Sequence, residues 1–147
     1  MNKRRLIIFL VMLVAVVGFI ATPVMAKTYS ANIKFNTQKD IGSSNHLCAS
    51  YDPKYSKSFY ISIVPHYPYW NYVTKAEVKY VKKINGKNKY TTKTHKAKIE
   101  YFTSDWTKPR QKIVSSSILV HKIPKGWKPE SAKVYYKKKI YNGKIIY

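Results

Sequence analysis

Hydrophobic and polar residues alternate along several short segments of this chain. Within residues 28–37 one face collects Tyr29, Ala31, Ile33 and Phe35, and the residues between them are polar. A period of two is typical of a β-strand with one buried face. The same spacing recurs at Phe59, Ile61 and Ile63, where Pro65 and Pro68 follow. Turn residues fill 42–45 and the Asp52-Pro53 step, so the first half of the chain is predicted to consist of strands.

The clearest prediction is a β-hairpin over residues 69–102. Its turn is Asn85-Gly86, because a two-residue type I′ turn needs positive φ at both positions. If Ile84 faces Lys87, one side of the hairpin is apolar and the other is polar. The register also places Tyr72 opposite Ile99 and Trp70 opposite Tyr101. The predicted apolar side comprises Trp70, Tyr72, Ala76, Val78, Tyr80, Ala97, Ile99 and Tyr101. The apolar residues gather near the base, so we expect the tip to project into solvent.

The rest of the chain also favours strands. Residues 111–123 and 131–141 are β-rich, and Asn142-Gly143 is a turn that leads into a short closing strand at 144–147. No stretch after residue 26 has helical periodicity. Short strands with frequent turns predict an all-β fold, a small antiparallel β-sandwich or barrel of about six to eight strands.

The first 26 residues have the organisation of a secretory signal peptide. A basic start at Lys3, Arg4 and Arg5 precedes an apolar run over 6–21, and small residues lead to a cleavage site after Ala26. An uncleaved membrane anchor is the alternative, but this run is shorter than the ~20 residues that span a bilayer. We expect a cleavable signal helix at 1–26, a single β domain at 27–147, and a protein that is secreted or associated with the cell surface.

The chain is strongly basic, with 28 Lys and Arg against 6 Asp and Glu and a formal net charge of +22. Cleavage after Ala26 removes three basic residues and no acid, which leaves a net charge of +19. Of the remaining basic residues only Arg110 is an arginine. Arginine reads base edges and grips phosphate in a bidentate way, whereas lysine acts as a point charge. Specific nucleic-acid binding is therefore disfavoured, and we expect an anionic wall polymer or an anionic lipid surface as partner. Surface solubility alone is the alternative explanation of the charge.

The sequence has no catalytic or metal-binding motif. Glu77 and Glu100 share one face of the predicted hairpin, but that register separates them by roughly 20 Å, too far for a glycosidase pair. His46 and Cys48 lie two residues apart on a strand, the only nucleophile and base in proximity; a buried side chain is the simpler interpretation of Cys48. The four histidines lack zinc-site spacing. We therefore predict a protein that is not an enzyme and needs no cofactor or metal.

Aromatic and lysine residues in loops are the candidate contacts with an envelope. Rings between prolines or beside lysines can stack on sugars or enter a membrane interface, and a lysine run adds charge. The candidates are Tyr67, Tyr69, Trp106, Trp127, Lys137, Lys138 and Lys139. The alternative is that these rings cover the end of the sandwich and that the lysines lie on a solvated strand face.

Two functions from different classes remain open. The first is a secreted cationic β-protein that acts on or binds the anionic bacterial envelope, in the manner of a bacteriocin or antimicrobial effector. The second is a non-lytic module that stays at the surface of its producer by adsorption to wall polymer. A structural or immunity role is a weaker third.

Overall fold

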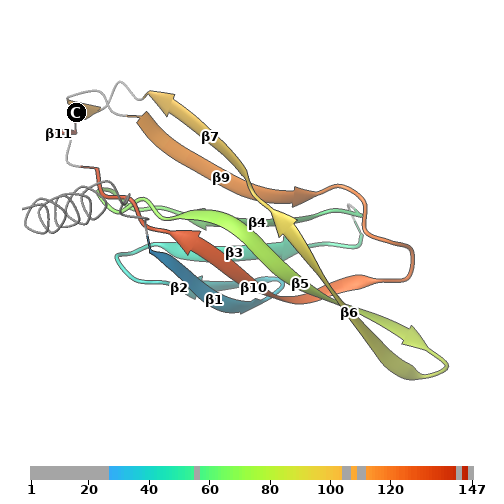
Figure 1. The fold of residues 1–147 in the computed structure, drawn as a ribbon. Coiled ribbons are helices and arrows are strands. Elements are labelled where there is room, and N and C mark those ends of the chain that lie inside the picture. The colour runs from blue at the N-terminus through green and yellow to red at the C-terminus, as the bar shows by residue number, and fades with distance from the viewer. Residues whose placement is uncertain (1–26, 55–56, 104–106, 109–111, 142–143, 146–147) are drawn as a thin grey trace, which may run out of the picture.

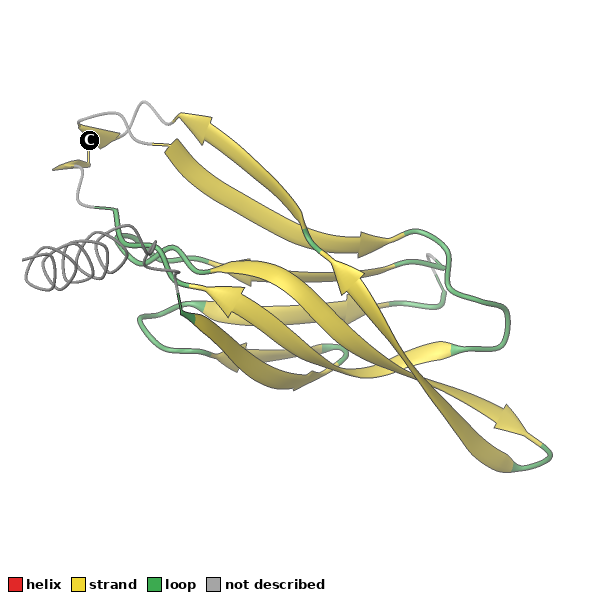
Figure 2. Ribbon diagram, in the orientation of Figure 1, coloured by secondary structure: helices red, strands yellow, loops and turns green. Residues whose placement is uncertain are grey.

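The computed structural model describes residues 27–54, 57–103, 107–108, 112–141 and 144–145. Strands and loops make up this part of the chain, and it contains no helix (Figures 1 and 2). The predicted all-β fold is therefore confirmed for this part of the chain. No helix in the described ranges is long and apolar enough to cross a membrane. The predicted signal helix and the cleavage site at Ala26 lie outside the described residues.

Two antiparallel sheets contain nine of the strands. The four-stranded sheet has the order β1 (Thr28–Lys34), β10 (Lys128–Lys137), β5 (Tyr72–Ile84) and β6 (Lys87–Lys96). The five-stranded sheet has the order β2 (Thr37–Asp40), β3 (His46–Tyr51), β4 (Phe59–Val64), β9 (Lys112–Val120) and β7 (Lys98–Thr103). A short pair, β8 (Thr107–Lys108) and β11 (Lys144–Ile145), stands apart. The number of strands exceeds the predicted six to eight, because several of the strands are short.

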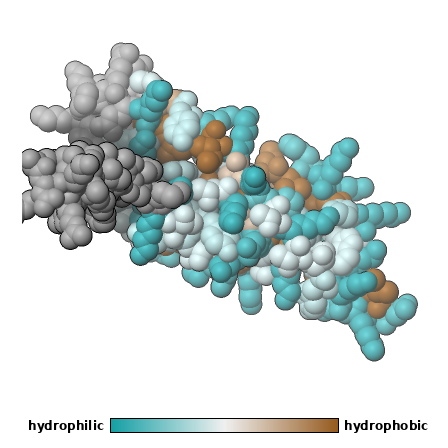
Figure 3. Space-filling model, viewed as in Figure 1, coloured by the Kyte–Doolittle hydropathy of each residue, from teal (hydrophilic) through white to brown (hydrophobic). Residues whose placement is uncertain are grey.

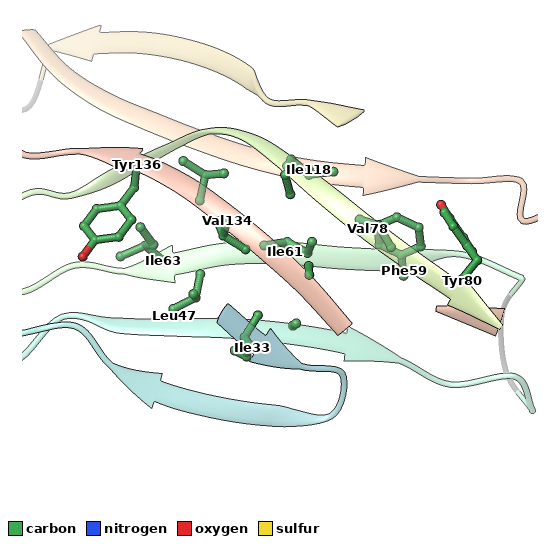
Figure 4. Packing of buried hydrophobic residues seen from close by; sticks show 14 residues of the cluster. Ile33, Leu47, Phe59, Ile61, Ile63, Val78, Tyr80, Ile118, Val134 and Tyr136 are labelled. Carbon is green, nitrogen blue, oxygen red and sulfur yellow. The ribbon is translucent and has the colours of Figure 1, made fainter. Parts of the chain in front are cut away.

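The core lies between the two sheets. Val78, Val134 and Ile33 from the first sheet meet Leu47, Ile61 and Ile118 from the second, and all are at most 5% exposed (Figure 4). The period-two pattern placed the buried face of β1 and β4 correctly. Two sheets that bury one face against each other form a sandwich-like layer structure without closing into a barrel.

The predicted hairpin forms with the expected turn and register. Ile84 pairs with Lys87, and the pairing continues to Lys75 and Lys96. Asn85 and Gly86 have φ values of 50° and 76°, as a type I′ turn requires. The tip extends beyond the rest of the molecule, at the lower right of Figure 1.

Beyond Lys96 the predicted register is wrong, because the chain changes sheets at Ala97. The amide of Ala97 still donates to the carbonyl of Thr74 at 2.9 Å, but the next residues form β7, which pairs with β9. Tyr72 therefore does not face Ile99, nor Trp70 face Tyr101. A strand that passes between layers bends at its corner, and alternation alone contains no sign of the bend.

A β-bulge near Thr74 alters the predicted buried face of β5. The register with β10 shifts there, so Tyr135 pairs with Lys75 and Tyr136 pairs with Val73. Val73 is consequently fully buried, while the predicted Tyr72 is only half-buried. The extra residue of a bulge reverses the alternation on one side of it.

The C-terminal segment also differs from prediction. The strand expected at 131–141 is β10, which begins earlier at Lys128 and ends at Lys137. The closing strand β11 pairs with β8 rather than with β10. The turn at 142–143 lies outside the described residues.

Candidate functional site

The predicted contact residues lie at opposite ends of the molecule. Tyr67, Tyr69 and the lysines 137–139 are at the end where β4 and β10 finish, whereas Trp127 precedes the first residue of β10. β10 has ten residues, so the two groups are roughly 30 Å apart. Trp106 lies outside the described residues. The structure thus does not bring the predicted residues together on one surface.

At the first of these ends the protein's own groups occupy much of the candidate surface. Trp70 and Lys139 exchange backbone hydrogen bonds of 2.7 and 3.2 Å. The ammonium of Lys138 lies 4.5 Å from the ring centre of Tyr29, and that of Lys139 lies 5.2 Å from the ring centre of Tyr141. Tyr67 is half-buried, and Tyr69 is 42% exposed. Part of this aromatic cluster therefore covers the end of the sandwich, as the structural alternative expects.

A further concentration of positive charge lies on the projecting hairpin. Residues 81–96, which we call the lysine hairpin, contain six lysines and no acidic residue. These are Lys82, Lys83, Lys87, Lys89, Lys93 and Lys96. Hydrophilic side chains surround the hairpin in Figure 3, with an apolar spot near its tip. This cluster was readable from the sequence as a lysine-rich stretch without acids, and the tip was expected to project into solvent, but the sequence analysis did not select it as a contact surface.

The pairing within the lysine hairpin places like charges face to face. Lys82 lies directly opposite Lys89, and at the base Lys75 lies directly opposite Lys96. Like charges at directly opposed positions of a sheet are destabilising. The opposed lysines therefore lower the stability of the hairpin. Solubility alone does not require like charges at opposed positions, because charges of alternating sign also keep a surface soluble.

Acidic side chains do not offset this charge among the described residues. The ion pairs there are Lys98–Glu100 at 2.8 Å and Lys79–Glu130 at 3.8 Å, both outside residues 81–96. Glu77 accepts a hydrogen bond of 3.1 Å from the Tyr135 hydroxyl. The other two described acids accept from backbone amides in their own turns. The positive field of the lysine hairpin is therefore directed at solvent.

The tip of the lysine hairpin also has a small apolar component. Ile84 is 39% exposed beside the turn, and Tyr90 is 47% exposed on the return strand. The Tyr90 ring has the ammonium of Lys79 at 4.3 Å from its centre. The tip thus combines several cations with two apolar side chains.

A groove lies beside the half of the lysine hairpin that is nearer its turn, and we call it the aromatic groove. It consists of three adjoining hollows of about 520, 430 and 320 Å³, all of which include Tyr51 in their lining. Trp127 lines the first and the third. The hairpin contributes Val81, Lys83 and Asn88. Of these residues the sequence analysis had named only Trp127.

Two hydrogen bonds join four chain segments in pairs around the aromatic groove. The Tyr51 amide donates to the Asn36 side chain at 2.8 Å, which joins the end of β3 to the β1–β2 turn. The Ile123 amide donates to the Lys57 carbonyl at 3.2 Å, which joins the β9–β10 loop to the β3–β4 loop. Tyr51 and Trp127 are half-buried and pack against the core cluster. The two rings are therefore held in place before any ligand arrives.

Gly126 lies close to the Lys82 side chain of the lysine hairpin. It has a φ of +84°, and a Cβ at this position would lie 3.0 Å from Lys82 Cε. The missing side chain lets Lys82 cross the loop, where its ammonium lies 5.9 Å from the ring centre of Trp127. The groove and the hairpin are consequently in contact.

A tyrosine–histidine pair supports the hairpin from the core side. The Tyr80 hydroxyl and His95 Nε2 are 2.8 Å apart, and Phe59 packs edge-on against the His95 ring. Burial raises the pKa of Tyr80 to about 12. Burial, with a smaller contribution from Lys93, lowers the pKa of His95. Both directions favour the neutral forms, in which the Tyr80 hydroxyl donates to His95 Nε2.

The described residues contain no group of three or more His, Cys, Asp and Glu that could hold a metal ion. Cys48 is half-buried, and its thiol donates to the His46 carbonyl at 3.9 Å rather than to the His46 ring. Glu100 lies on β7 in the other sheet from Glu77, and it forms an ion pair with Lys98.

Two further hollows lie along β9. One of about 390 Å³ is lined by Lys96, Lys98 and the serines 115–117. The other, of about 170 Å³, lies where β9 separates from β4. Asn71 Oδ1 and Ser116 Oγ, from residues that line it, are buried without a hydrogen-bond partner among the described residues. Solvent does not reach either atom, so neither presents a binding group to the surface.

Comparison with known proteins gives no match, since no protein-family model, no curated protein and no solved structure matches the chain. The function must therefore be inferred from the chain's own residues.

Proposed function

We propose that this chain is a secreted, cationic, non-enzymatic protein that binds the anionic bacterial envelope through its lysine hairpin. The observation that carries the proposal is the opposed pair Lys82 and Lys89 in a segment of six lysines without an acid. Such a pair lowers stability in the free protein, and a bound polyanion relieves the repulsion. The signal peptide over 1–26 belongs to the same proposal, because only an exported protein meets this partner.

Binding to an anionic wall polymer is the favoured form of this function. Lysine contacts at an exposed hairpin form without a preformed pocket and are screened by salt. The two exposed apolar side chains, Ile84 and Tyr90, are few beside six lysines. This balance favours adsorption to a charged polymer over insertion into a bilayer.

Adsorption over a salt series tests the proposal. The protein is mixed with immobilised polyphosphate and, as a control, with a neutral dextran matrix. We expect retention on polyphosphate alone, with an affinity that falls steeply as salt rises because polyanion binding releases counterions. Retention on both matrices, or on polyphosphate regardless of salt, would contradict the proposal.

Lysis of the envelope is the second candidate, and the exposed Ile84 beside the cationic turn is the observation in its favour. An apolar residue among lysines at a hairpin tip can enter the headgroup layer of an anionic membrane. Dye release from vesicles of phosphatidylglycerol, compared with phosphatidylcholine vesicles, distinguishes it from adsorption. Leakage from the anionic vesicles that an Ile84→Ser variant loses would establish lysis, and binding without leakage would leave adsorption as the function.

A further inference from the structure

The aromatic groove gives the proposed partner a chemical class. We propose that this groove binds a pyranose ring of an anionic polysaccharide, while the lysine hairpin holds neighbouring acidic groups of the same chain. The inference rests on the proposed function, since it specifies which anionic polymer of the envelope the protein recognises. The proposed partner is a sugar-containing polymer, as distinct from a simple polyanion or a lipid surface.

The first support is the shape of the groove. Its hollows of about 520, 430 and 320 Å³ fall in the ~300–1,000 Å³ range that is typical of small-ligand sites. They adjoin each other because each includes Tyr51. A row of linked hollows fits consecutive units of a chain better than it fits one isolated molecule.

The second support is the chemistry of the walls. Tyr51 and Trp127 are large rings held against the core, and flat aromatic faces stack on the apolar faces of sugar rings. Asn36 and Asn88 line one hollow with Tyr51, Asn88 also lines the hollow that Tyr51 shares with Trp127, and both amides can hydrogen-bond to hydroxyl groups. A polyphosphate chain has no ring that could stack on these aromatic faces, so the walls of the groove favour a sugar-containing ligand.

The third support is the charge around the groove. Four lysines contribute to its lining, and the one acidic lining residue, Glu130, lies within ion-pair distance of Lys79. These lysines are Lys57, Lys83, Lys125 and Lys128. A neutral sugar chain has no anionic group to pair with these lysines, so we infer that the polymer carries carboxylate or phosphate groups.

A lipid headgroup layer fits the groove less well. Interfacial tryptophans work by projecting into the headgroup layer, whereas Trp127 is half-buried and its ring packs on the core. The ammonium of Lys82 lies near the same ring. A flexible polymer can enter such a recess, but a bilayer surface reaches only what protrudes.

Three soluble probes test the inference by calorimetry or fluorescence titration. Oligogalacturonate supplies acidic pyranose rings, polyphosphate supplies charge without rings, and cellohexaose supplies rings without charge. At about 0.5 M NaCl, where the Debye length is only ~4 Å, we expect oligogalacturonate binding to persist and polyphosphate binding to vanish. This comparison uses the unaltered protein and does not depend on the folding of any variant.

Two variants then locate the sugar contact. Trp127→Leu is expected to weaken oligogalacturonate binding about tenfold and to leave polyphosphate binding within about twofold, because only the ring contact is lost. Tyr51→Leu is the second variant and is expected to behave in the same way, with circular dichroism to confirm that each remains folded. Cellohexaose is expected to bind weakly to the unaltered protein and not to Trp127→Leu.

The outcomes separate the two proposals. If polyphosphate and oligogalacturonate both fail to bind the unaltered protein at low salt, the proposed function fails. If both bind but are lost together at about 0.5 M NaCl, or if both ring variants bind oligogalacturonate normally, the function stands and the sugar site is refuted. Equal loss of binding to phosphatidylglycerol vesicles and to oligogalacturonate in Trp127→Leu would assign the groove to lipid instead.

Discussion

At the scale of single residues, Gly126 links the stability of the β9–β10 loop to the shape of the aromatic groove. Its positive φ disfavours any other residue, and its missing side chain makes room for Lys82. Gly42 offers a matched control, because it has a similar φ of +96° but nothing within 4 Å of the position of a Cβ. The two glycines therefore separate backbone strain from contact with the hairpin.

We predict that Gly126→Ala and Gly42→Ala each lower the free energy of unfolding by about 1 kcal/mol, since a side chain in the left-handed region costs roughly that much. Only Gly126→Ala is expected to weaken oligogalacturonate binding, because Gly126 lines two of the hollows and an added side chain narrows them. Urea unfolding and the titration described above measure the two effects. Equal binding by both variants would show that Gly126 has no influence on the groove.

His95 makes stability depend on pH. Burial lowers its pKa below 6.5 in the folded protein, so the unfolded chain takes up a proton first as the pH falls. The contribution of the neutral imidazole is complete above pH 6.5 and is lost as the pH falls through the lower folded pKa. We predict a lower melting temperature at about pH 5.5 than at pH 7.5, with a smaller difference in His95→Gln. An unchanged difference in the variant would rule out His95 as the source.

At the scale of elements, the strand pattern predicted the hairpin turn and the faces of β1 and β4, because each depends on local alternation and turn chemistry. It did not predict the bulge near Thr74 or the change of sheet at Ala97. Both depend on how β10 and β9 pack against the hairpin, and these strands are distant in the sequence. The predicted apolar side of the hairpin was accordingly wrong beyond Thr74.

Substitutions at the bulge test this corrected packing. Val73 is fully buried, whereas Ile99, which the sequence pattern had placed on the apolar side, is 38% exposed. We predict that Val73→Ala lowers the free energy of unfolding by about 2 kcal/mol and Ile99→Ala by less than about 1 kcal/mol, because truncation of a buried side chain costs most. Chemical denaturation measures both. The reverse order would support the original register.

Repulsion within the lysine hairpin is a second property of an element. We predict that Lys89→Glu raises the free energy of unfolding by about 0.2–1 kcal/mol, because it converts the opposed pair with Lys82 into an attractive one. Lys93→Glu is the matched control, since it makes the same charge change opposite Val78. Both variants are expected to bind polyphosphate more weakly. A Lys89→Glu variant no more stable than Lys93→Glu would show that the opposed lysines cost nothing.

At the scale of the whole molecule, the net charge was evident from composition, but its distribution was not. The sequence analysis named the lysines 137–139 as candidate contacts, and the fold places two of them over the protein's own rings. The lysine hairpin is also rich in lysine, but it projects from the fold and contains no acidic residue (Figure 1). Trp127 was identified as a candidate, yet its partner Tyr51 was missed because the two are brought together by loops far apart in the chain.

Two quadruple variants that remove equal charge from opposite ends of the molecule test whether the lysine hairpin governs polyanion binding. One replaces Lys83, Lys87, Lys89 and Lys93 with glutamine. The other replaces Lys112, Lys137, Lys138 and Lys139. The affinity of each for polyphosphate is measured at low salt and at physiological salt, beside the unaltered protein.

We predict that the hairpin variant loses about 10- to 30-fold in affinity at low salt, as four exposed contacts of ~0.5 kcal/mol each imply, and that its salt dependence becomes shallower. The variant at the opposite end is expected to lose less than about threefold, because it changes only the long-range field. Equal losses in the two variants would contradict the account and show that net charge, not the lysine hairpin, governs binding.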